Sequence, residues 1–403
     1  MKKILIVLIS LILIAFIALS GWYLLFKSPN TPVAETIKNI LPFGSAPTSS
    51  GVGVPTSSPT GASEGTEARS TSNLFRISAE PVAGAVVLKA TIVRYVDRAT
   101  GHIYDTDLVT MVTTKVTNQT LPKIYEAYFK EDGNSVLLRS LREDSDMIDN
   151  LVWTLTPPKA GALDTLYSAT STRLQGKIGS VAVGSGNALF YTMEDTSSIM
   201  TSAFNGAGAK KLLNSSFKDW RVASAANTLI VYTKASRDVS GYAYTLNTLN
   251  ESLTKLLGPL NALTLIPNTA NNRVLYSYVE SGKTKTFAKN LKTNALSEIV
   301  PSTLAEKCVW SVKNTDLVFC GAPTEDWDKG EPDNWYRGLT HFSDHIWLFD
   351  TKVNIARVLV EPKSVLDQDI DAVELKLSAN EDYLVFINKN DLSLWALRLV
   401  DSI

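Results

Sequence analysis

The sequence has little cysteine and little histidine. Its 403 residues include two cysteines and three histidines. Two cysteines are too few for a structural zinc site, which takes four Cys or His ligands, and the eleven residues between them match no redox motif. His341 and His345 are four residues apart, but they flank a segment that reads as a loop entering a strand rather than a helix. We therefore expect no metal site and no cofactor.

The signatures of several protein classes are also missing. Residues 74–403 contain no G-x-S-x-G elbow, and no glycine-rich loop there has the lysine or the following helix that would cradle a phosphate. Charge is balanced, with 39 Lys and Arg against 40 Asp and Glu, and no basic block is interleaved with aromatic residues. Nucleic acid is therefore not an expected partner. We expect no recognised enzyme and assign no catalytic residue, although a hydrolase remains an alternative.

A long hydrophobic run occurs at the N-terminus. The 23 residues Ile4–Phe26 carry no charge and follow two lysines, a length that suits a transmembrane helix. Leading basic residues favour a cytoplasmic N-terminus, and Trp22 and Tyr23 lie where an interfacial aromatic belt would. The alternative is a cleaved signal peptide ending in the small residues of Ala18–Ser20. We expect a signal anchor over residues 1–27, which makes the chain a single-pass membrane protein with its remainder outside the cytoplasm.

Aromatic residues are scarce in the segment that follows the anchor. Residues 28–73 are rich in Ser, Thr, Pro and Gly, and such a composition cannot bury enough apolar surface to offset its chain entropy. We predict a disordered linker that tethers a β-rich domain, residues 74–403, to the membrane.

Residues 74–403 show almost no helical periodicity and instead repeat a strand pattern. A polar turn precedes four or five apolar, β-favouring residues, and these runs start at Thr91, Val136, Ala188, Leu229, Val274, Leu317 and Leu384. The starts are 41 to 52 residues apart, with one step of 67, which is close to the period of a four-stranded propeller blade. Other strand candidates flank each run, so we predict seven units of three or four strands in an all-β, closed architecture.

The two ends of this region are predicted to complete one blade. The last unit has three strand candidates, and the first unit is preceded by a spare one, Leu74–Ser78. Pairing the spare strand with the last unit would close the ring and remove an exposed edge. The expected fold is therefore a seven-bladed β-propeller whose last blade contains the N-terminal strand.

Three segments resemble the repeats of TolB-like and WD-repeat-like bacterial β-propellers. They are Asp219–Thr233, Lys307–Gly321 and Ser343–Thr351, which read DWRVASAANTLIVYT, KCVWSVKNTDLVFCG and SDHIWLFDT. The GH…WD signature of WD repeats is absent, so the resemblance concerns architecture and assigns no activity. It implies that ligands bind on the face formed by the loops between second and third strands and by the loops that enter each blade.

The step of 67 residues reflects an insertion, Gly321–His345, between the second and third strands of the sixth unit. Aromatic rings beside charges are typical of binding hot spots. The candidate binding residues are Trp327, Asp328, Asp333, Trp335, Tyr336 and Arg337. Two other interpretations remain: the two tryptophans pack the loop onto its own blade, or the acidic residues hold calcium, although no glutamate closes an EF-hand pattern. A second insertion, Leu155–Gly179, is predicted to form an exposed rim loop.

Both cysteines lie in the hairpin from which the first insertion projects. Cys308 and Cys320 have equal offsets from Asn314 in the predicted turn, so they become cross-strand neighbours with Cα atoms about 4.5–5.5 Å apart. That separation permits a disulfide, and disulfides persist outside the cytoplasm. We expect a disulfide; the alternative is two reduced cysteines packed side by side.

Two functions fit these expectations. The first is a membrane-anchored, extracytoplasmic scaffold that binds protein or glycan partners in the cell envelope. The second is an extracytoplasmic hydrolase of glycans or peptidoglycan, in which paired carboxylates do acid–base work. Its candidate carboxylates are Asp326, Asp328, Glu331 and Asp333. Solvated acidic loops look the same in sequence, so we prefer the first function.

Overall fold

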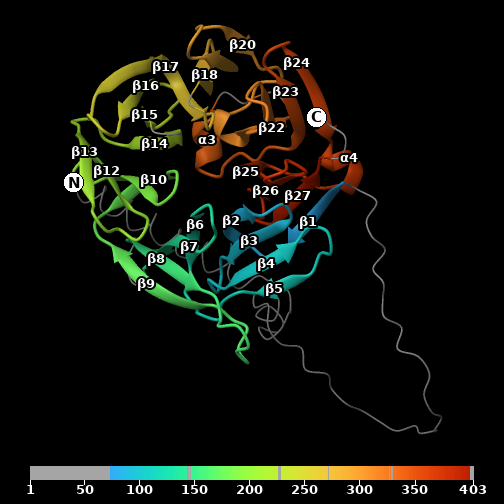
Figure 1. Ribbon diagram of the computed structural model, residues 1–403. Coiled ribbons are helices and arrows are strands. Elements are labelled where there is room, and N and C mark those ends of the chain that lie inside the picture. Colours follow the sequence, from blue (N-terminus) through green and yellow to red (C-terminus); the bar gives the residue numbers. More distant parts are fainter. Residues whose placement is uncertain are drawn as a thin grey trace, which may run out of the picture. The chain divides into compact units, whose positions relative to one another are not determined.

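The computed structural model describes residues 73–399 except 143, 144, 146, 226, 227, 271, 326, 328 and 329. The predicted anchor over residues 1–27 and the predicted linker up to residue 72 lie outside the described residues. Within the described part, no helix has both the length and the apolar character needed to cross a membrane. This part of the chain is almost entirely β-structure, with its sheets set around a common centre (Figure 1).

Three four-stranded sheets come first along the chain, each with antiparallel strands in sequential order. The first sheet comprises β2 (Val82–Leu88), β3 (Ile92–Asp97), β4 (Ile103–Asp107) and β5 (Thr113–Lys115). The second comprises β6 (Ile124–Phe129), β7 (Ser135–Leu141), β8 (Ile148–Thr156) and β9 (Ser168–Leu174). The third comprises β10 (Ile178–Val183), β11 (Ala188–Met193), β12 (Ser198–Ala203) and β13 (Lys210–Asn214). Figure 1 shows the first strand of each sheet nearest the centre.

The fourth sheet has seven strands. It comprises β14 (Trp220–Ala225), β15 (Thr228–Thr233), β16 (Ser240–Asn247), β17 (Leu253–Pro267), β18 (Arg273–Glu280), β19 (Lys283–Asn290) and β20 (Leu296–Glu298). The long strand β17 pairs with β16 in its first part and with β18 in its second. Near the change of partner, Gly258 has a φ of 104°, and a Cβ there would lie 2.5 Å from the carbonyl oxygen of Gly241. Only glycine fits at this position. Through its two pairings, β17 joins two groups of strands in one sheet.

Two further four-stranded sheets complete the described part. One comprises β21 (Cys308–Trp310), β22 (Leu317–Pro323), β23 (Asp344–Asp350) and β24 (Ile355–Val360). The other comprises β25 (Ala372–Leu377), β26 (Tyr383–Asn388), β27 (Leu394–Arg398) and β1 (Leu74–Ser78). Three short helices lie between strands: the 3-10 turn η1 (Ala305–Lys307), α3 (Asp333–Tyr336) and α4 (Pro362–Leu366).

Strand β1 closes the ring as the sequence predicts. It pairs antiparallel with β27, with Leu74 opposite Leu397 and Arg76 opposite Trp395. The sheet order β1-β27-β26-β25 therefore joins the first described strand to the last three. The pairing covers the edge of β27 and ties the two ends of the described part together in one sheet.

The sheets pack face to face, and alternate residues of one strand reach the neighbours on its two sides. In β26, Phe386 belongs to a buried cluster that contains Phe319 of β22. The adjacent residue Val385 belongs to a different cluster, which contains Val93 of β3. This period of two is that of a strand buried on both faces. Packing on both faces holds the sheets, and with them the innermost strands and their loops, in place around the centre.

Candidate functional site

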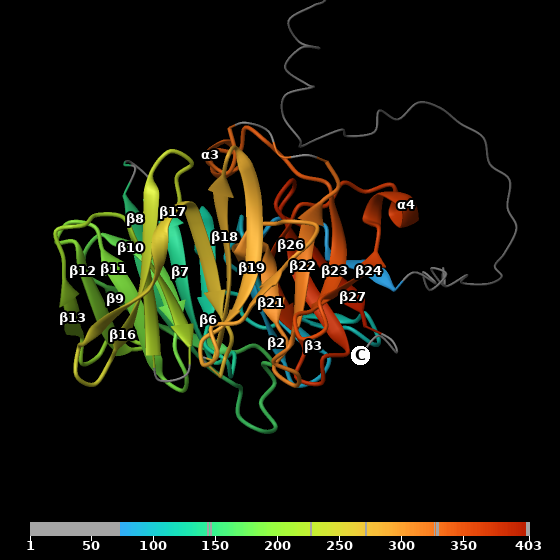
Figure 2. The same cartoon turned by 90° about the horizontal axis from the view of Figure 1, so that it is seen from above.

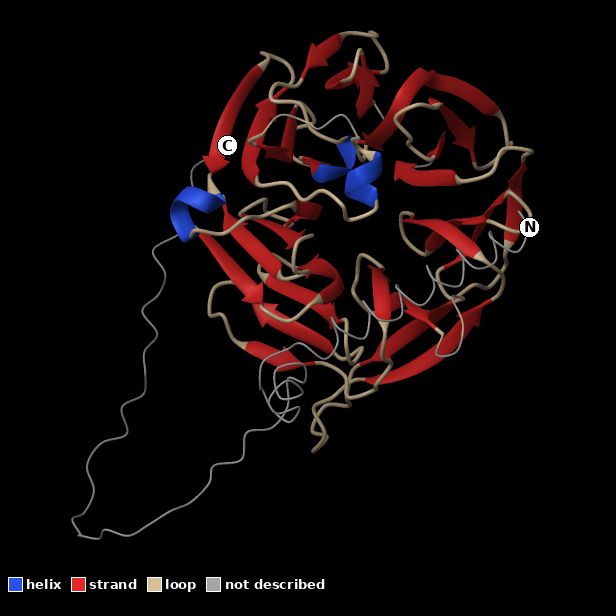
Figure 3. Ribbon diagram, turned by 180° about the vertical axis from the view of Figure 1, so that it is seen from behind, coloured by secondary structure: helices blue, strands red, loops and turns tan. Residues whose placement is uncertain are grey.

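The insertion in the sheet of β21–β24 lies at the centre of one face of the ring. It connects β22 to β23 and contains α3. Figures 1 and 3 show α3 close to the ring centre, and Figure 2 shows it at one edge of the side view. The insertion thus reaches the centre on the face formed by connections between second and third strands, where the sequence places it.

A buried group of three charges supports the insertion from below. The Nζ of Lys307 lies 2.8 Å from Oδ2 of Asp344 and 2.5 Å from Oδ1 of Asp371, and all three side chains are fully buried. The amide of Ala372 also donates to Oδ2 of Asp344 at 2.7 Å. Burial raises the pKa of Asp344 to about 6, against the lowering effect of the Lys307 charge. These residues come from three elements, so the group ties η1, β23 and the start of β25 together.

Trp335 is part of this buried support. Only 4% of it is exposed, and its indole N–H donates to Oδ2 of Asp371 at 2.7 Å. Its ring stacks on Phe342, and the ammonium groups of Lys307 and Lys389 lie 5.5 Å and 4.7 Å from the ring centroid. Trp335 is one of the predicted binding residues. Its burial and its bond to a buried carboxylate fit the other interpretation, in which this tryptophan packs the insertion onto the ring.

The acidic residues of the insertion are also engaged in holding it. Glu331 is buried and accepts a hydrogen bond from the backbone amide of Trp335 at 2.9 Å. Asp333 accepts from the hydroxyl of Ser236 at 3.1 Å and from the amide of Arg237 at 2.7 Å. Ser236 and Arg237 follow β15, so Asp333 fixes the insertion to the neighbouring seven-stranded sheet. Asp333 is thus engaged through both oxygens, whereas Glu331 is engaged through Oε2 and its buried Oε1 has no hydrogen-bond partner within the described residues.

The remaining predicted binding residues lie in different surroundings. Trp327 is half-buried and packs against Phe342 at 4.8 Å between ring centroids. Arg337 is exposed, and Asp328 lies outside the described residues. Tyr336 is 40% exposed and lines two pockets at the ring centre. Of the predicted set, Tyr336 is therefore the residue that the structure brings to a cavity.

A pocket of about 680 Å³, which we call the funnel, opens on the face that carries α3. It is lined by Tyr125, Glu126, Tyr128, Arg139, Met147, Ile148, Gly176, Lys177, Ile178, Gly179, Ser180, Glu194, Arg221, Glu306 and Tyr336. These residues come from three sheets and the loops beside them, from η1 and from the insertion. Pockets of this volume are typical of small-molecule sites.

One wall of the funnel is a closed polar network. Arg139 donates to Glu126 at 2.7 Å, to Asn150 at 3.2 Å and to the carbonyl of Ile178 at 2.8 Å. Its guanidinium lies 5.3 Å from the ring centroid of Tyr125, and burial raises the pKa of the Tyr125 hydroxyl to about 12. Because every nitrogen of Arg139 has a partner, this wall shapes the funnel rather than awaiting a ligand.

A smaller pocket of about 220 Å³ adjoins the funnel beneath Tyr336. Both pockets are lined by Arg221, Glu306 and Tyr336. Burial raises the pKa of Glu306, against the lowering effects of a hydrogen bond with Tyr336 and of nearby cations led by Arg221. Burial and Glu306 together raise the pKa of Tyr336. We call these three residues, with the adjacent Tyr232, the central cluster.

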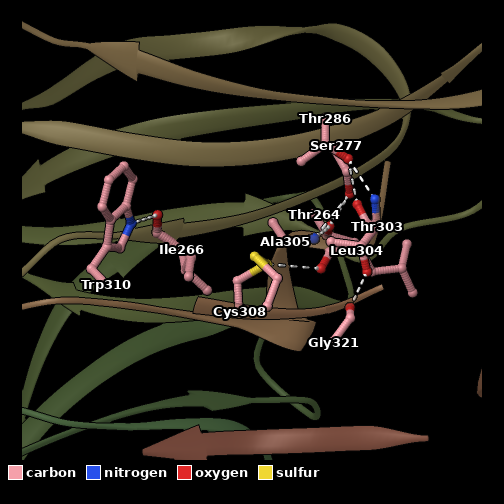
Figure 4. The surroundings of a disulfide bond; sticks show 11 residues. Thr264, Ile266, Ser277, Thr286, Thr303, Leu304, Ala305, Cys308, Trp310 and Gly321 are labelled. Carbon is pink, nitrogen blue, oxygen red and sulfur yellow. Dashed lines mark hydrogen bonds between the residues drawn. A yellow bond between two sulfur atoms is a disulfide. The ribbon is translucent and has the colours of Figure 1, made fainter. Parts of the chain in front are cut away.

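The two cysteines hold the strand that follows Glu306. Cys308 lies directly opposite Cys320, and a disulfide joins them with a Cα–Cα distance of 4.1 Å. Just before Cys308, the amide of Ala305 donates to the hydroxyls of Thr264 and Ser277, both at 3.2 Å (Figure 4). The disulfide and these bonds therefore fix both ends of η1, the turn that carries Glu306 and Lys307.

The second predicted insertion lies at the opposite ends of the strands. Its loop connects β8 to β9 and projects from the other side of the ring (Figure 2). Tyr167 at its end lines an open pocket of about 810 Å³ and packs on Arg94, 5.1 Å from the ring centroid. Arg94 is itself bound to both oxygens of Asp105 at 2.7 Å and to the carbonyl of Gly133 at 3.0 Å. Arg94 and Asp105 in this pocket wall are therefore already paired.

Arg221 and Glu306, which line both pockets, are not among the binding residues predicted from the sequence. Each is one charged residue at the start of a strand in a generic repeat, about 85 residues apart in the sequence. The available signal was weak: Glu306 and Lys307 form an adjacent pair of opposite charges before the apolar strand β21, and Arg221 follows Trp220 at the start of β14. Among the described residues, no group of three or more His, Cys, Asp or Glu side chains could hold a metal ion.

Comparison with known proteins identifies a fold. No protein-family model matches the sequence, and no curated protein matches it. An oligogalacturonate lyase from Vibrio parahaemolyticus is similar in structure, with 9% identity, a TM-score of 0.56, and coverage of 82% of this chain and 94% of that one. A chain of the mitotic checkpoint complex is similar with 11% identity, a TM-score of 0.52, and coverage of 88% and 99%.

A TolB structure from Acinetobacter baumannii also matches, with 15% identity, a TM-score of 0.43, and coverage of 68% of this chain and 62% of that one. At these identities the likenesses show architecture alone. The expected propeller architecture is supported by the two likenesses above whose TM-scores exceed 0.5.

Proposed function

We propose that this chain is a membrane-anchored, extracytoplasmic β-propeller that binds a protein or glycan partner of the cell envelope through the funnel. The hydrophobic run Ile4–Phe26 supports the anchor and the location. We also propose that the ring has seven blades: β14–β16 with the first part of β17 form one, and the second part of β17 with β18–β20 forms the next. Five four-stranded sheets supply the others.

One observation carries the binding proposal. The funnel gathers aromatic and charged side chains from three sheets and η1, and the insertion, which carries Tyr336, is held by its own hydrogen bonds to the ring. Pre-formed pockets with a few converging polar groups are the usual ligand sites of rigid scaffolds. The insertion thus acts as a fixed part of the site and presents Tyr336, rather than its tryptophans, to a partner.

A capture experiment tests this function. The full-length chain, and its Tyr336→Ala and Arg337→Ala variants, would be used to capture proteins and glycans from solubilised envelopes under matched loading. We expect one or more partners to be lost with Tyr336→Ala and retained with Arg337→Ala, whose side chain is exposed outside the funnel. Equal capture by all three chains would contradict the funnel as the site.

A second experiment tests the proposed location. Protease is added to intact cells, which are then fractionated. An intact domain in the soluble fraction would contradict an extracytoplasmic, membrane-anchored chain.

A hydrolase acting on glycans remains the second candidate, and one observation favours it. Three carboxylates line the funnel: Glu126 is paired with Arg139 at 2.7 Å, Glu194 is paired with Lys177 at 3.0 Å, and burial raises the pKa of Glu306. A carboxylic acid with a raised pKa near a second carboxylate is an arrangement that glycoside hydrolysis uses. Release of reducing ends from peptidoglycan fragments by the full-length chain, lost with Glu306→Gln, would support this function. No turnover by the wild-type chain would remove it.

A further inference from the structure

Arg221 differs from the two arginines that line the other pocket walls. Arg94 and Arg139 each place all their guanidinium nitrogens on carboxylate, amide or carbonyl oxygens. Arg221 is half-buried in the funnel wall, and it makes no hydrogen bond or ion pair with any residue that the structure describes. A guanidinium in a partly desolvated wall binds a carboxylate strongly and often through two parallel hydrogen bonds.

Glu306 offers the complementary charge. Its Oε1 is enclosed and has no hydrogen-bond partner within the described part of the chain. The two nearby lysines are committed elsewhere: Lys307 lies between Asp344 and Asp371, and Lys389 donates to the carbonyl of Trp335 at 2.9 Å. Burying a carboxylate oxygen without a hydrogen-bond donor costs free energy. A ligand with an N–H group can supply the missing hydrogen bond and so bind favourably there.

The walls around these two charges suit a small molecule. Arg221 and Glu306 line both the funnel, at about 680 Å³, and the smaller pocket, at about 220 Å³. Tyr232 lies opposite Arg221 in the pairing of β14 with β15, and Tyr336 completes the cover. The charges are thus placed on a shared boundary with two phenol groups beside them. A neutral glycan would leave both charges unpaired, which disfavours it.

We propose that Arg221 and Glu306 bind the carboxylate and the ammonium group of one small zwitterionic ligand, of the amino-acid or short-peptide class. This inference rests on the proposed binding function and specifies its ligand chemistry. The carboxylate accepts from Arg221, the ammonium donates to Oε1 of Glu306, and the rings of Tyr232 and Tyr336 contact the carbon skeleton between them. Free amino acids and peptide ends share this chemistry.

Calorimetric titration of the full-length chain with matched probes tests the inference. The probes are alanyl-alanine, its N-acetyl form, its C-terminal amide and the doubly blocked form; alanine and trialanine then separate amino acid from peptide. We expect each single block to weaken binding about 10-fold to 100-fold, as for a lost hydrogen bond to a charged group. Arg221→Met should weaken alanyl-alanine binding and remove the preference for acid over amide. Glu306→Gln should remove the preference for amine over acetyl.

Control variants remove charge elsewhere on the same ring. Lys210 and Glu251 form an exposed ion pair at 2.7 Å, so Lys210→Gln and Glu251→Gln should leave every probe affinity unchanged within about 2-fold. Equal binding of all four dipeptide probes overturns the inference, as does a preference that survives both Arg221→Met and Glu306→Gln. Absence of binding by every probe at millimolar concentration also overturns it.

The failure of this inference is distinguishable from failure of the proposed function. If no probe binds but envelope capture still depends on Tyr336, the funnel binds a partner of other chemistry and the zwitterion assignment is wrong. If alanyl-alanine binds with the expected preferences while capture is insensitive to Tyr336→Ala, the ligand assignment stands and the envelope-partner function is wrong.

Discussion

The two insertions that interrupt the repeat lie at opposite ends of the strands and are held in opposite ways (Figure 2). The connection from β22 to β23 is held through Asp333, which accepts from the amide of Arg237 after β15, and through Trp335, which contacts Asp371 before β25 and Lys307 of η1. The connection from β8 to β9 is held by the ring at its end, where Tyr167 packs on Arg94 and its amide donates to the carbonyl of Val116 at 2.8 Å. Before Tyr167 it has local bonds, such as the amide of Leu166 donating to Asp164. Leu163 in this second loop is fully exposed.

The two insertions have similar compositions but differ in the buried residues that they contact. Both segments are rich in turn-forming residues and both interrupt the strand period. Beneath α3, the β22–β23 connection lies against a buried pair of opposite charges, Lys307 from η1 and Asp371 from before β25. The β8–β9 connection meets no such buried charge pair in the described part of the chain. The two loops thus differ in whether buried charges of the ring lie against them.

Replacing Lys307, the cation beneath the first insertion, should have the largest effect on the free energy of unfolding. Lys307→Met leaves Asp344 and Asp371 as buried carboxylates without their cation, so we expect a loss of about 3–5 kcal/mol in the free energy of unfolding. Denaturant titration of the full-length chain would measure it. The matched control is Lys363→Met: Lys363 also lies near two aspartates, at 3.1 and 3.0 Å, but is 52% exposed, and should lose under about 1 kcal/mol. Equal losses for both lysines would contradict the account.

Removing the disulfide should have the next largest effect. The bond closes a loop with a sequence separation of 12 between Cys308 and Cys320, and a loop of that length gives roughly 3 kcal/mol or less. The double replacement by serine should lower stability by that order and loosen η1, which precedes Cys308. Hydrogen exchange of the Ala305 amide should then rise in the variant. Two free thiols in non-reducing mass spectrometry of the native chain would contradict the bond itself.

The buried carboxylate Asp344 predicts a dependence of stability on pH. Its folded-state pKa is about 6, above the usual 3.8, so the folded state binds the proton more tightly than the unfolded state does. Its stabilising contribution is present at low pH and is lost as the pH rises from about 4 through 6. The stability of the wild type minus that of Asp344→Asn should fall over this window by on the order of 3 kcal/mol. A difference that is flat or rises with pH would contradict the burial of an ionisable Asp344.

Shortening the second insertion should have the smallest effect. Replacing residues 158–165 by a Gly-Ser turn removes side chains that are mostly exposed and shortens one loop, so stability should change by under about 1 kcal/mol. Thermal melting would measure the change, and alanyl-alanine binding should persist because the loop is on the other face. A large loss of stability would show that this loop, like the first, has partners in the ring.

The sequence predicts local pairing far better than it predicts the site. The closure by Leu74–Ser78 and the register of Cys308 with Cys320 follow from strand periods and turn positions, which are properties of neighbouring residues. The union of two strand groups through β17 is not visible in the period, because it depends on the bend at Gly258.

The predicted binding residues illustrate the limit. Composition correctly drew attention to the β22–β23 insertion, and Tyr336 does line the funnel. Composition could not distinguish Trp335, which is buried against Asp371, from a surface ring, since that requires knowing that residue 371 lies beneath it. Arg221 and Glu306 are far apart in the sequence and line the same two pockets only in the folded ring, so no local pattern identifies them.

The most direct test is a crystal structure of the full-length chain grown with alanyl-alanine. The account predicts the dipeptide at the boundary of the two pockets, with its carboxylate within hydrogen-bond distance of Arg221 and its ammonium on Oε1 of Glu306. Dipeptide found beside Tyr167 on the other face, or a central cluster that stays without ligand at saturating dipeptide, would contradict it.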